Sequence, residues 1–317
     1  MSREQRTTEA LQTRKTKWKK EQVFALVVAC IPLLGFIIFN GFPLLISFIG
    51  MFCNVDLYDL TNIQWNNFEG FKSVFIPRHA YDLFYFDLAK YFYKAVIITV
   101  WIASTQLVTL LIALFVATLL HEKPNGAKLF QILFFIPYIC STVAVSLMWR
   151  WILDWEGGIL NSLLGTDIRW LEDPKTITWC IIIAIIWQAP GYGIVMYKAA
   201  FSNINSALYE AAKIDGASMF QRIWNIDLPA LVPMIIMQLI MCAGGIMNVG
   251  FEKVMLLQTE LNKAASDVLA VYVYEQGNLN AKYSYSTAVG LFNTAINIVL
   301  LIVVNTISKK AADIDIV

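Results

Sequence analysis

Long apolar segments recur along this 317-residue chain, and they limit what it can fold into. An α-helix rises 1.5 Å per residue, so roughly 20 apolar residues cross the hydrocarbon core of a bilayer. A helix also satisfies its own backbone polar groups there, where water cannot. We predict an all-α polytopic membrane protein with six transmembrane helices: residues 22–52, 94–120, 127–153, 177–200, 228–250 and 287–308.

The composition supports a membrane protein and argues against other classes. The chain is 58% hydrophobic and 15% charged, with a mean hydropathy of +0.60, whereas soluble domains carry about 25% charged residues. A net charge of +1 indicates no nucleic-acid partner. The five cysteines lie in or beside apolar segments without metal-ligand spacing, so we expect no metal site.

The distribution of basic residues predicts the orientation. Lys and Arg concentrate on the cytoplasmic side of membrane proteins, and the first 21 residues are rich in both. We therefore expect residues 1–21 to form a basic cytoplasmic tail, residues 22–310 a six-helix transmembrane domain, and residues 311–317 a cytoplasmic C-terminal tail. Six spans also place the loop between the fourth and fifth helices, residues 201–227, in the cytoplasm.

That loop carries the segment EAAKIDGASMFQRIWNIDLP, Glu210–Pro229. Residues 205–215 are mostly strong helix formers, and Asn205 or Ser206 is suited to cap a short helix. Gly216 permits a turn that a residue with a Cβ would resist. A second helical piece is expected at about 217–225, after which Pro229 fits the first turn of the next helix. An amphipathic helix lying on the membrane surface is the alternative structural interpretation.

The spacing of this segment resembles the cytoplasmic coupling loop of the integral-membrane subunit of ABC importers. The signature positions are filled by Glu210, Ala211, Ala212, Gly216, Ile226, Leu228 and Pro229. The resemblance implies a coupling helix that sits in a cleft of an ATP-hydrolysing partner. The residues expected to make this contact are Glu210, Ala211, Ala212, Lys213, Asp215 and Gly216.

Three further segments resemble carbohydrate permeases of the maltose-type class, in the branch that imports complex and uronate-containing oligosaccharides. They are NVGFEKVMLL (248–257), SDVLAVYVYEQG (266–277) and YSYSTAVGLFNTAIN (283–297). The resemblance implies a multi-pass protein of the bacterial cytoplasmic (inner) membrane with both termini in the cytoplasm. It also implies a second related permease subunit, two nucleotide-binding ATPase subunits and an extracytoplasmic sugar-binding protein.

The chain itself is not expected to be an enzyme. It contains no GxxxxGK[ST] motif, so ATP and Mg are expected on the partner ATPase and no cofactor on this chain. The predicted spans hold no paired His/Asp/Glu or Ser/Lys constellation, so no catalytic residue is assigned. They also hold no Asp or Glu to relay protons, which argues against a secondary transporter.

Polar and aromatic residues inside the apolar helices are candidates for the substrate pathway. Amides bind sugar hydroxyls, aromatic rings stack on sugar C–H faces, and polar groups in a span usually face other helices or a wet cavity. The candidates are Trp187, Gln188, Tyr192, Gly245, Asn248, Asn293 and Asn297. Helix–helix packing is the alternative explanation for these residues. An importer of another solute, such as a polyol or glycerol phosphate, also remains open.

Overall fold

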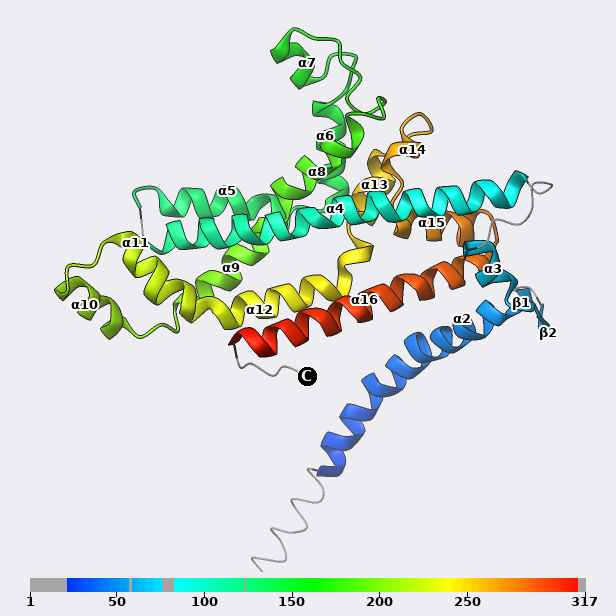
Figure 1. The fold of residues 1–317 in the computed structure, drawn as a ribbon, viewed down its shortest axis with the longest axis horizontal. Helices are drawn as coiled ribbons and strands as arrows, with labels where there is room; N and C mark the ends of the chain where they lie inside the picture. Colours follow the sequence, from blue (N-terminus) through cyan, green and yellow to red (C-terminus); the bar gives the residue numbers. More distant parts are fainter. Residues whose placement is uncertain (1–21, 57–58, 76–82, 123, 313–317) are drawn as a thin grey trace, which may run out of the picture. The chain divides into compact units, whose positions relative to one another are not determined.

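The computed structural model describes residues 22–56, 59–75, 83–122 and 124–312 (Figure 1). The chain divides into two compact units, residues 1–70 and residues 71–317. The predicted tail at 1–21 and the last five residues of the predicted tail at 311–317 lie outside the described residues.

The first unit is a long helix followed by a β-hairpin. Its helix, Gln22–Phe52, passes through the π-helix η1 (Ile37–Gly41) into α2 (Phe42–Phe52). Pro43 is the second residue of α2, just after the π turn, and its missing N–H leaves a helical carbonyl without its usual partner. Strands β1 (Cys53–Asp56) and β2 (Asp59–Trp65) pair antiparallel. This hairpin is the only sheet in the described part of the chain, so the predicted all-α class is confirmed.

The second unit is built almost entirely of helices. α3 (Glu69–Phe75) begins at the boundary between the units. The elements that follow are α4 (Leu83–His121), α5 (Ala127–Ile139), α6 (Thr142–Ile152), α7 (Ile159–Leu164), α8 (Ile177–Gln188), α9 (Pro190–Phe201), α10 (Ser206–Ile214), α11 (Met219–Arg222), η2 (Ile223–Asp227), α12 (Leu228–Gly245), η3 (Ile246–Asn248), α13 (Phe251–Leu257), α14 (Lys263–Ser266), α15 (Leu269–Tyr274), η4 (Glu275–Leu279) and α16 (Tyr283–Ala312).

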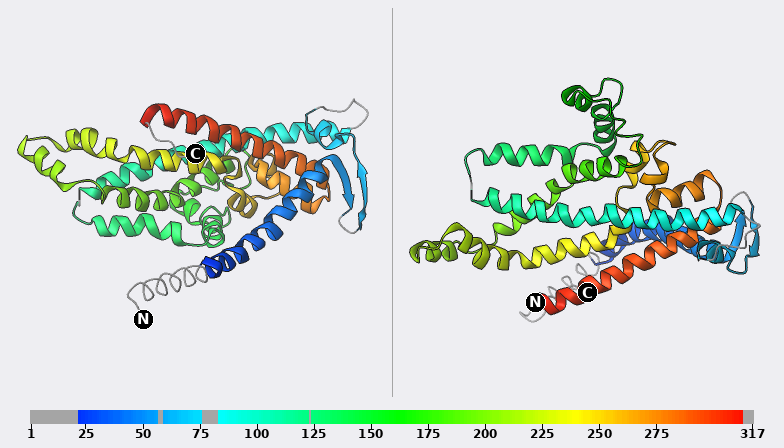
Figure 2. Two further views of the ribbon diagram at one scale, coloured as in Figure 1. Left: turned by 90° about the horizontal axis from the view of Figure 1, so that it is seen from below. Right: turned by 45° about the horizontal axis from the view of Figure 1, so that its top comes forward.

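The core of the second unit runs along α4. This helix packs against α8 and α9, α5 packs against α9, and α12 packs against α16. Figure 2 shows these helices from two further directions. Three buried clusters line up on it: one around Ile102 with residues of α8 and α13, one around Phe92 with α15 and α16, and one around Ala113 with α9 and α12. All three of these residues belong to α4, so this helix organises the unit.

Among the described residues, five helices are long and apolar enough to cross a membrane, and a bent pair makes six if it counts as one span. The five are Gln22–Phe52, Tyr91–His121, Ile177–Phe201, Met219–Leu257 and Tyr283–Lys309. The continuous helix predicted over 127–153 is wrong, because α5 and α6 meet at 102°. The helix Met219–Leu257 corresponds to the predicted span 228–250 but begins earlier. It therefore includes Asp227, which the predicted span left out.

The bend between α5 and α6 has a local and a tertiary cause. Pro137 lies inside α5 and has no N–H to donate to the preceding turn. The backbone then becomes extended at Cys140 and Ser141, with ψ of 140° and 135°. Gln188 of α8 donates its Nε2–H to the Cys140 carbonyl at 3.1 Å, so a carbonyl exposed by the break gains a partner.

Candidate functional site

Residues 201–227, which we call the polar loop, fold into two short helices joined by a tight turn. α10 begins after Asn205, whose side-chain oxygen accepts a hydrogen bond from the Ala207 amide at 3.0 Å. This cap satisfies one of the free amides of the first helical turn. The predicted cap is therefore confirmed at Asn205.

Gly216 ends α10 with a φ of +68°, in the left-handed region that favours glycine. The Gly216 amide donates to the Lys213 carbonyl at 3.2 Å, and the Ala217 amide donates to the Ala212 carbonyl at 2.9 Å. These two bonds form a Schellman motif, which satisfies the last carbonyls of the helix. The turn predicted at Gly216 is confirmed, together with the physical reason for a glycine there.

The second half of the polar loop is fixed by a capping box. The Ser218 hydroxyl accepts from the Gln221 amide at 3.4 Å, and the Gln221 side chain accepts from the Ser218 amide at 2.7 Å. This pairing starts α11. The chain then widens into η2 and enters α12 with Pro229 in its first turn, as predicted. The loop is therefore ordered by its own hydrogen bonds.

The expected contact residues lie on the outer face of the polar loop. Glu210, Ala211, Lys213, Asp215 and Gly216 are exposed, and Ala212 is partly buried. Large apolar side chains share this exposure: Ile214 is 86% exposed, Phe220 81% and Trp224 72%. The sequence pattern alone assigns these three side chains no role. Apolar surface of this kind marks contact with a protein or with lipid.

Tyr209 joins α10 to the start of α12. Its hydroxyl donates to Asp227 Oδ1 at 2.6 Å, and Asp227 is fully buried with Oδ2 unpaired. Burial, the bond to Asp227 and the nearby carboxylates raise the pKa of Tyr209, so its proton stays in place. The His121 ring stacks on Phe201 at 4.3 Å and lies 5.5 Å from the Tyr209 ring. Sequence reasoning missed this cluster, although an acid next to an apolar segment was a usable signal.

An ion pair joins the polar loop to the connection between α4 and α5. Arg222 Nη2 lies 2.8 Å from Glu122 Oε2, and both side chains are mostly buried. These residues are 100 positions apart. The ion pair and the Tyr209–Asp227 hydrogen bond together hold the base of the polar loop against the ends of α4 and α12.

Three of the candidate amides meet where α12 breaks. Asn293 donates its Nδ2–H to Asn248 Oδ1 at 2.9 Å, and Asn297 Oδ1 accepts from the Met247 amide at 3.3 Å. Gly245, just before the break, has no atom within 4 Å of the position a Cβ would take. Asn293 and Asn297 lie one turn apart on one face of α16, and their side chains both bond to η3.

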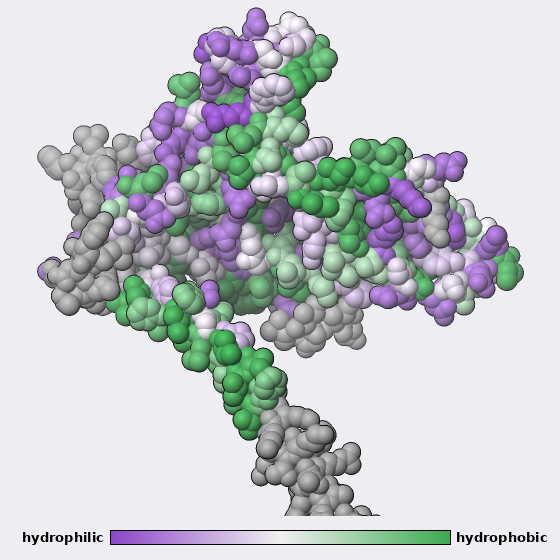
Figure 3. Space-filling view, turned by 180° about the vertical axis from the view of Figure 1, so that it is seen from behind, coloured by the Kyte–Doolittle hydropathy of each residue, from purple (hydrophilic) through white to green (hydrophobic). Residues whose placement is uncertain are grey.

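An open hollow of about 570 Å³ lies beside this amide cluster. It is lined by Thr142, Asn248, Gly250, Phe251, Glu252, Lys253, Ala270, Val273 and Asn293. Hydrophilic and apolar residues alternate across the second unit in Figure 3, whereas the helix of the first unit presents a largely apolar surface. The hollow combines amides, a hydroxyl, an aromatic ring and two opposite charges, a lining suited to a polar solute.

The other candidate set does not line this hollow. Gln188 is buried and bonded to the α5–α6 break, while Trp187 packs edge-on against Trp149 at 6.0 Å. Tyr192 lies 5.8 Å from Tyr138. A Cβ on Gly191, which adjoins Tyr192, would lie 2.7 Å from the Tyr138 Cβ. Close helix packing explains this glycine, and the structure does not bring this set together with the asparagines.

Comparisons with known proteins give one consistent result. Residues 109–313 match the family described as "Binding-protein-dependent transport system inner membrane component". Protein LplB of Bacillus subtilis is 34% identical over 255 residues, 78% of this chain and 76% of that protein. The polygalacturonan/rhamnogalacturonan transport system permease protein YteP of Bacillus subtilis is 35% identical over 187 residues, 58% of each chain.

Solved structures share the fold over nearly the whole chain. A bacterial ABC transporter involved in the import of the acidic polysaccharide alginate matches with a TM-score of 0.78 and 26% identity, covering 93% of this chain and 98% of that chain. A bacterial alginate ABC transporter in complex with an alginate pentasaccharide-bound periplasmic protein matches with a TM-score of 0.77 and 27% identity, covering 94% and 99%.

Proposed function

The chain belongs to the family of binding-protein-dependent transport system inner membrane components, and from this premise we propose that it is the permease subunit of an ATP-driven importer that carries an oligosaccharide into the cytoplasm. The family is one of transport permeases and not of enzymes. The sugar-related names of its relatives and of the alginate importer support an oligosaccharide as the solute.

The single observation that carries this proposal is the hydrogen-bonded, ordered structure of the polar loop. A capped helix, a Schellman turn and a capping box present an exposed face on a base fixed by Tyr209–Asp227 and Arg222–Glu122. Such a rigid element transmits a push from a partner without deforming. We infer that Glu210, Ala211, Ala212, Lys213, Asp215 and Gly216 contact an ATPase subunit, with Ile214, Phe220 and Trp224 covered in that complex.

The remaining partners follow from the same proposal. A second related permease subunit would complete the pathway, two ATPase subunits would bind ATP and Mg, and an extracytoplasmic protein would deliver the sugar. This chain would hold no cofactor. Both termini and the polar loop would lie in the cytoplasm of a bacterial inner membrane, in agreement with the basic residues at 1–21.

The hollow beside the broken α12 is the best-supported part of the substrate pathway. Asn248 and Asn293 line it, and Phe251 offers an aromatic face beside Glu252 and Lys253. We assign Asn297 and Gly245 to shaping the break and Gln188 to holding the α5–α6 bend. Trp187 and Tyr192 remain pathway candidates at a second position.

The decisive experiment is reconstitution of the chain with its co-purifying partners in proteoliposomes, with ATP enclosed on the cytoplasmic side. We expect ATP-dependent uptake of an oligosaccharide delivered by the binding protein. Glu210→Ala should abolish uptake while the chain still inserts, and Glu156→Ala, an exposed acid in the α6–α7 connection, should leave it unchanged. Uptake driven by an ion gradient without a bound ATPase would contradict the proposal. If only glycerol phosphate or a polyol is taken up, the chain is an ABC importer subunit for that solute and not for an oligosaccharide.

A further inference from the structure

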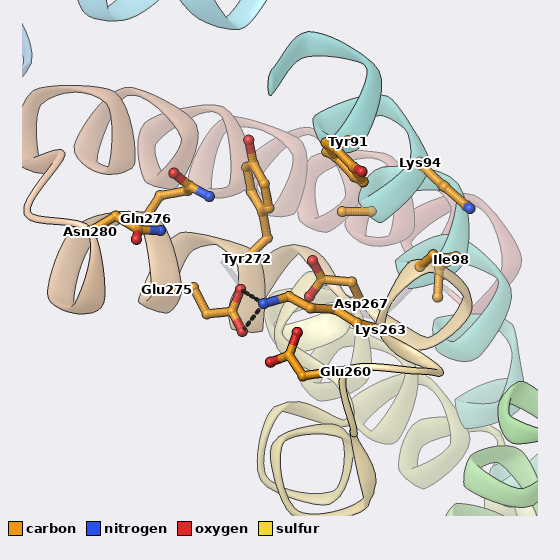
Figure 4. Close-up of a pocket in the computed structure, with 12 residues that line it drawn as sticks. Tyr91, Lys94, Ile98, Glu260, Lys263, Asp267, Tyr272, Glu275, Gln276 and Asn280 are labelled. Atoms are coloured by element: carbon orange, nitrogen blue, oxygen red, sulfur yellow. Dashed lines mark hydrogen bonds and ion pairs between the residues drawn. The ribbon is translucent and has the colours of Figure 1, made fainter. Parts of the chain in front are cut away.

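A separate pocket lies in the second unit at the other end of α4 from the polar loop (Figure 4). It has a volume of about 360 Å³ and is enclosed by α4, α14, α15 and η4. Tyr91 and Lys94 come from α4, and Glu260, Lys263, Asp267, Glu275 and Gln276 come from the segment after α13. None of these residues belongs to the proposed coupling contact or substrate pathway.

Asp267 carries the unbalanced charge of this pocket. Lys263 and Glu275 form an ion pair at 2.7 Å, so these two charges are matched. Asp267 is only 9% exposed, and its Oδ1 has no hydrogen-bond partner. Burial and the charge of Glu275 raise the pKa of Asp267 to about 7, against the opposing effects of Lys263 and Gln258. The nearby ammonium of Lys263 is already paired with Glu275, so no positive group in the pocket is matched to Asp267 alone.

A second acceptor in the pocket is also unpaired. Gln276 Oε1 is buried and has no hydrogen-bond partner. A buried acceptor without a donor is costly, and the cost disappears when a ligand supplies the donor. Two unpaired acceptors, three carboxylates and two ammonium groups line one cavity, so the lining calls for a positively charged ligand with several donors.

We propose that this pocket binds a guanidinium or ammonium group, which donates hydrogen bonds to Asp267 and Gln276. Figure 4 shows Asp267 beside the Lys263–Glu275 pair, with Tyr91 on the α4 side of the cavity. The Tyr91 ring is 53% exposed and offers a face for a cation–π contact. A metal ion does not fit, because no group of three or more His, Cys, Asp or Glu side chains with metal-binding geometry occurs in the described residues.

Two sources can supply such a group, and the experiment separates them. One is a small organic cation free in solution. The other is a basic side chain of an extracytoplasmic protein that docks on the permease, a source that rests on the function proposed above. The pocket chemistry itself does not rest on that function, because binding of a free cation needs no transport.

Binding should depend on pH with a defined sign. The cation favours ionised Asp267, so affinity should rise about tenfold from pH 6 to pH 8, across a pKa of about 7. The facing groups are Glu260 and Glu275, Lys94 and Lys263, and the phenols of Tyr91 and Tyr272. Burial lowers the pKa of Lys263, but the bond to Glu275 and the charges of Glu275, Asp267 and Glu260 together outweigh burial and raise this pKa overall. Burial raises the pKa of Tyr272. Neither group changes charge in this window.

The test uses the assembled transporter in nanodiscs and calorimetric titration with arginine methyl ester, with glucose as the neutral probe. We expect saturable binding of the ester and none of glucose at this site. Asp267→Asn should weaken ester binding at least tenfold at pH 8 and remove its pH dependence, and Gln276→Met should weaken it without changing the pH dependence. Glu156→Gln should behave as the unchanged protein.

A second arm measures the affinity of the binding protein for the same nanodiscs. If the cation is a docked side chain, Asp267→Asn should lower that affinity and the ester should compete with the binding protein. If it is free in solution, docking should be unchanged. The proposal would be overturned if the ester fails to bind in both arms. It would also be overturned if Glu156→Gln weakens ester binding as much as Asp267→Asn does, or if glucose binds in place of the ester. Basal ATPase activity of Asp267→Asn, expected to be unchanged, shows that the variant assembles.

Discussion

Gly216 is the residue at which the polar loop depends most on backbone conformation. Its φ is +68°, and nothing lies within 4 Å of a Cβ placed there, so a side chain would meet strain and no clash. We expect Gly216→Val to destabilise the turn by about 1–2 kcal/mol, the usual cost of the left-handed region. Substrate-stimulated ATPase activity and uptake should fall together, measured on reconstituted complexes.

Gly165 supplies the matched control for this prediction. It ends α7 with a φ of +64° and equally open space. Gly165→Val introduces the same backbone strain far from the polar loop and should leave the coupling of ATPase activity to uptake intact. Equal loss of coupling in both variants would show that general instability, and not the α10 turn, causes the defect.

The Tyr209 hydroxyl donates a hydrogen bond to buried Asp227, and the aromatic ring alone cannot make this contact. Tyr209→Phe would remove the donor to Asp227, leaving both oxygens of a fully buried carboxylate unpaired. A loss of about 1–3 kcal/mol at this contact is expected. We expect ATPase activity to continue while uptake per ATP falls, because α10 is no longer tied to α12.

Tyr283→Phe is the control for the hydroxyl prediction. It removes the same group at the start of α16, where the described contacts include no hydrogen bond from this phenol. Uptake per ATP should stay at its original level. If Tyr209→Phe also keeps it, the Tyr209–Asp227 bond does not connect the loop to the span.

At the level of elements, Arg222 and Glu122 join the polar loop to the α4–α5 connection at 2.8 Å. Arg222→Glu and Glu122→Arg should each impair uptake, because each places like charges together in a mostly buried site. The double exchange should recover part of the loss, since the pair is restored with reversed signs. Uptake and complex yield are measured for all four proteins. Additive losses in the double variant would show that the two residues act separately.

The elements differ in how much of them could be predicted from the sequence. Hydrophobic length identified five of the spans, because the cost of burying polar backbone in lipid is a local property of a segment. The cap at Asn205 and the turn at Gly216 were also local and are confirmed. The bend after Cys140 was not foreseen, because apolar residues continue on both sides of it and its stabilising partner is Gln188, 48 positions away.

The same distinction explains the candidate site residues. Asn293 and Asn297 share a face of α16 by simple periodicity, but that they meet Asn248 and Met247 depends on the tertiary break in α12. Asp227 escaped notice because its partner Tyr209 is 18 positions away and outside the predicted span. Polar residues whose partners lie on another element cannot be assigned a role from spacing alone.

At the scale of the whole molecule, each proposed role places a region on a definite side of the membrane. The polar loop must face an ATPase in the cytoplasm. The α6–α7 connection is separated from it by one span, Ile177–Phe201, and must then face outward. Both regions offer exposed acids: Asp215 in the loop and Glu156 in the connection. The topology can therefore be tested without knowing the solute or the partners.

We expect Glu156→Cys and Asp215→Cys, each in a background with Cys30, Cys53, Cys140, Cys180 and Cys242 replaced by alanine or serine, to react differently with a membrane-impermeant maleimide. Glu156→Cys should be labelled in intact spheroplasts, and Asp215→Cys only after permeabilisation. If the bent pair α5–α6 counts as one crossing, an even number of crossings separates Asp215 from the N-terminal tail, and both should share a side. Labelling of Asp215→Cys and not of Glu156→Cys in intact spheroplasts would mean that the bent pair α5–α6 does not complete a crossing. The polar loop would then be outside the reach of an ATPase.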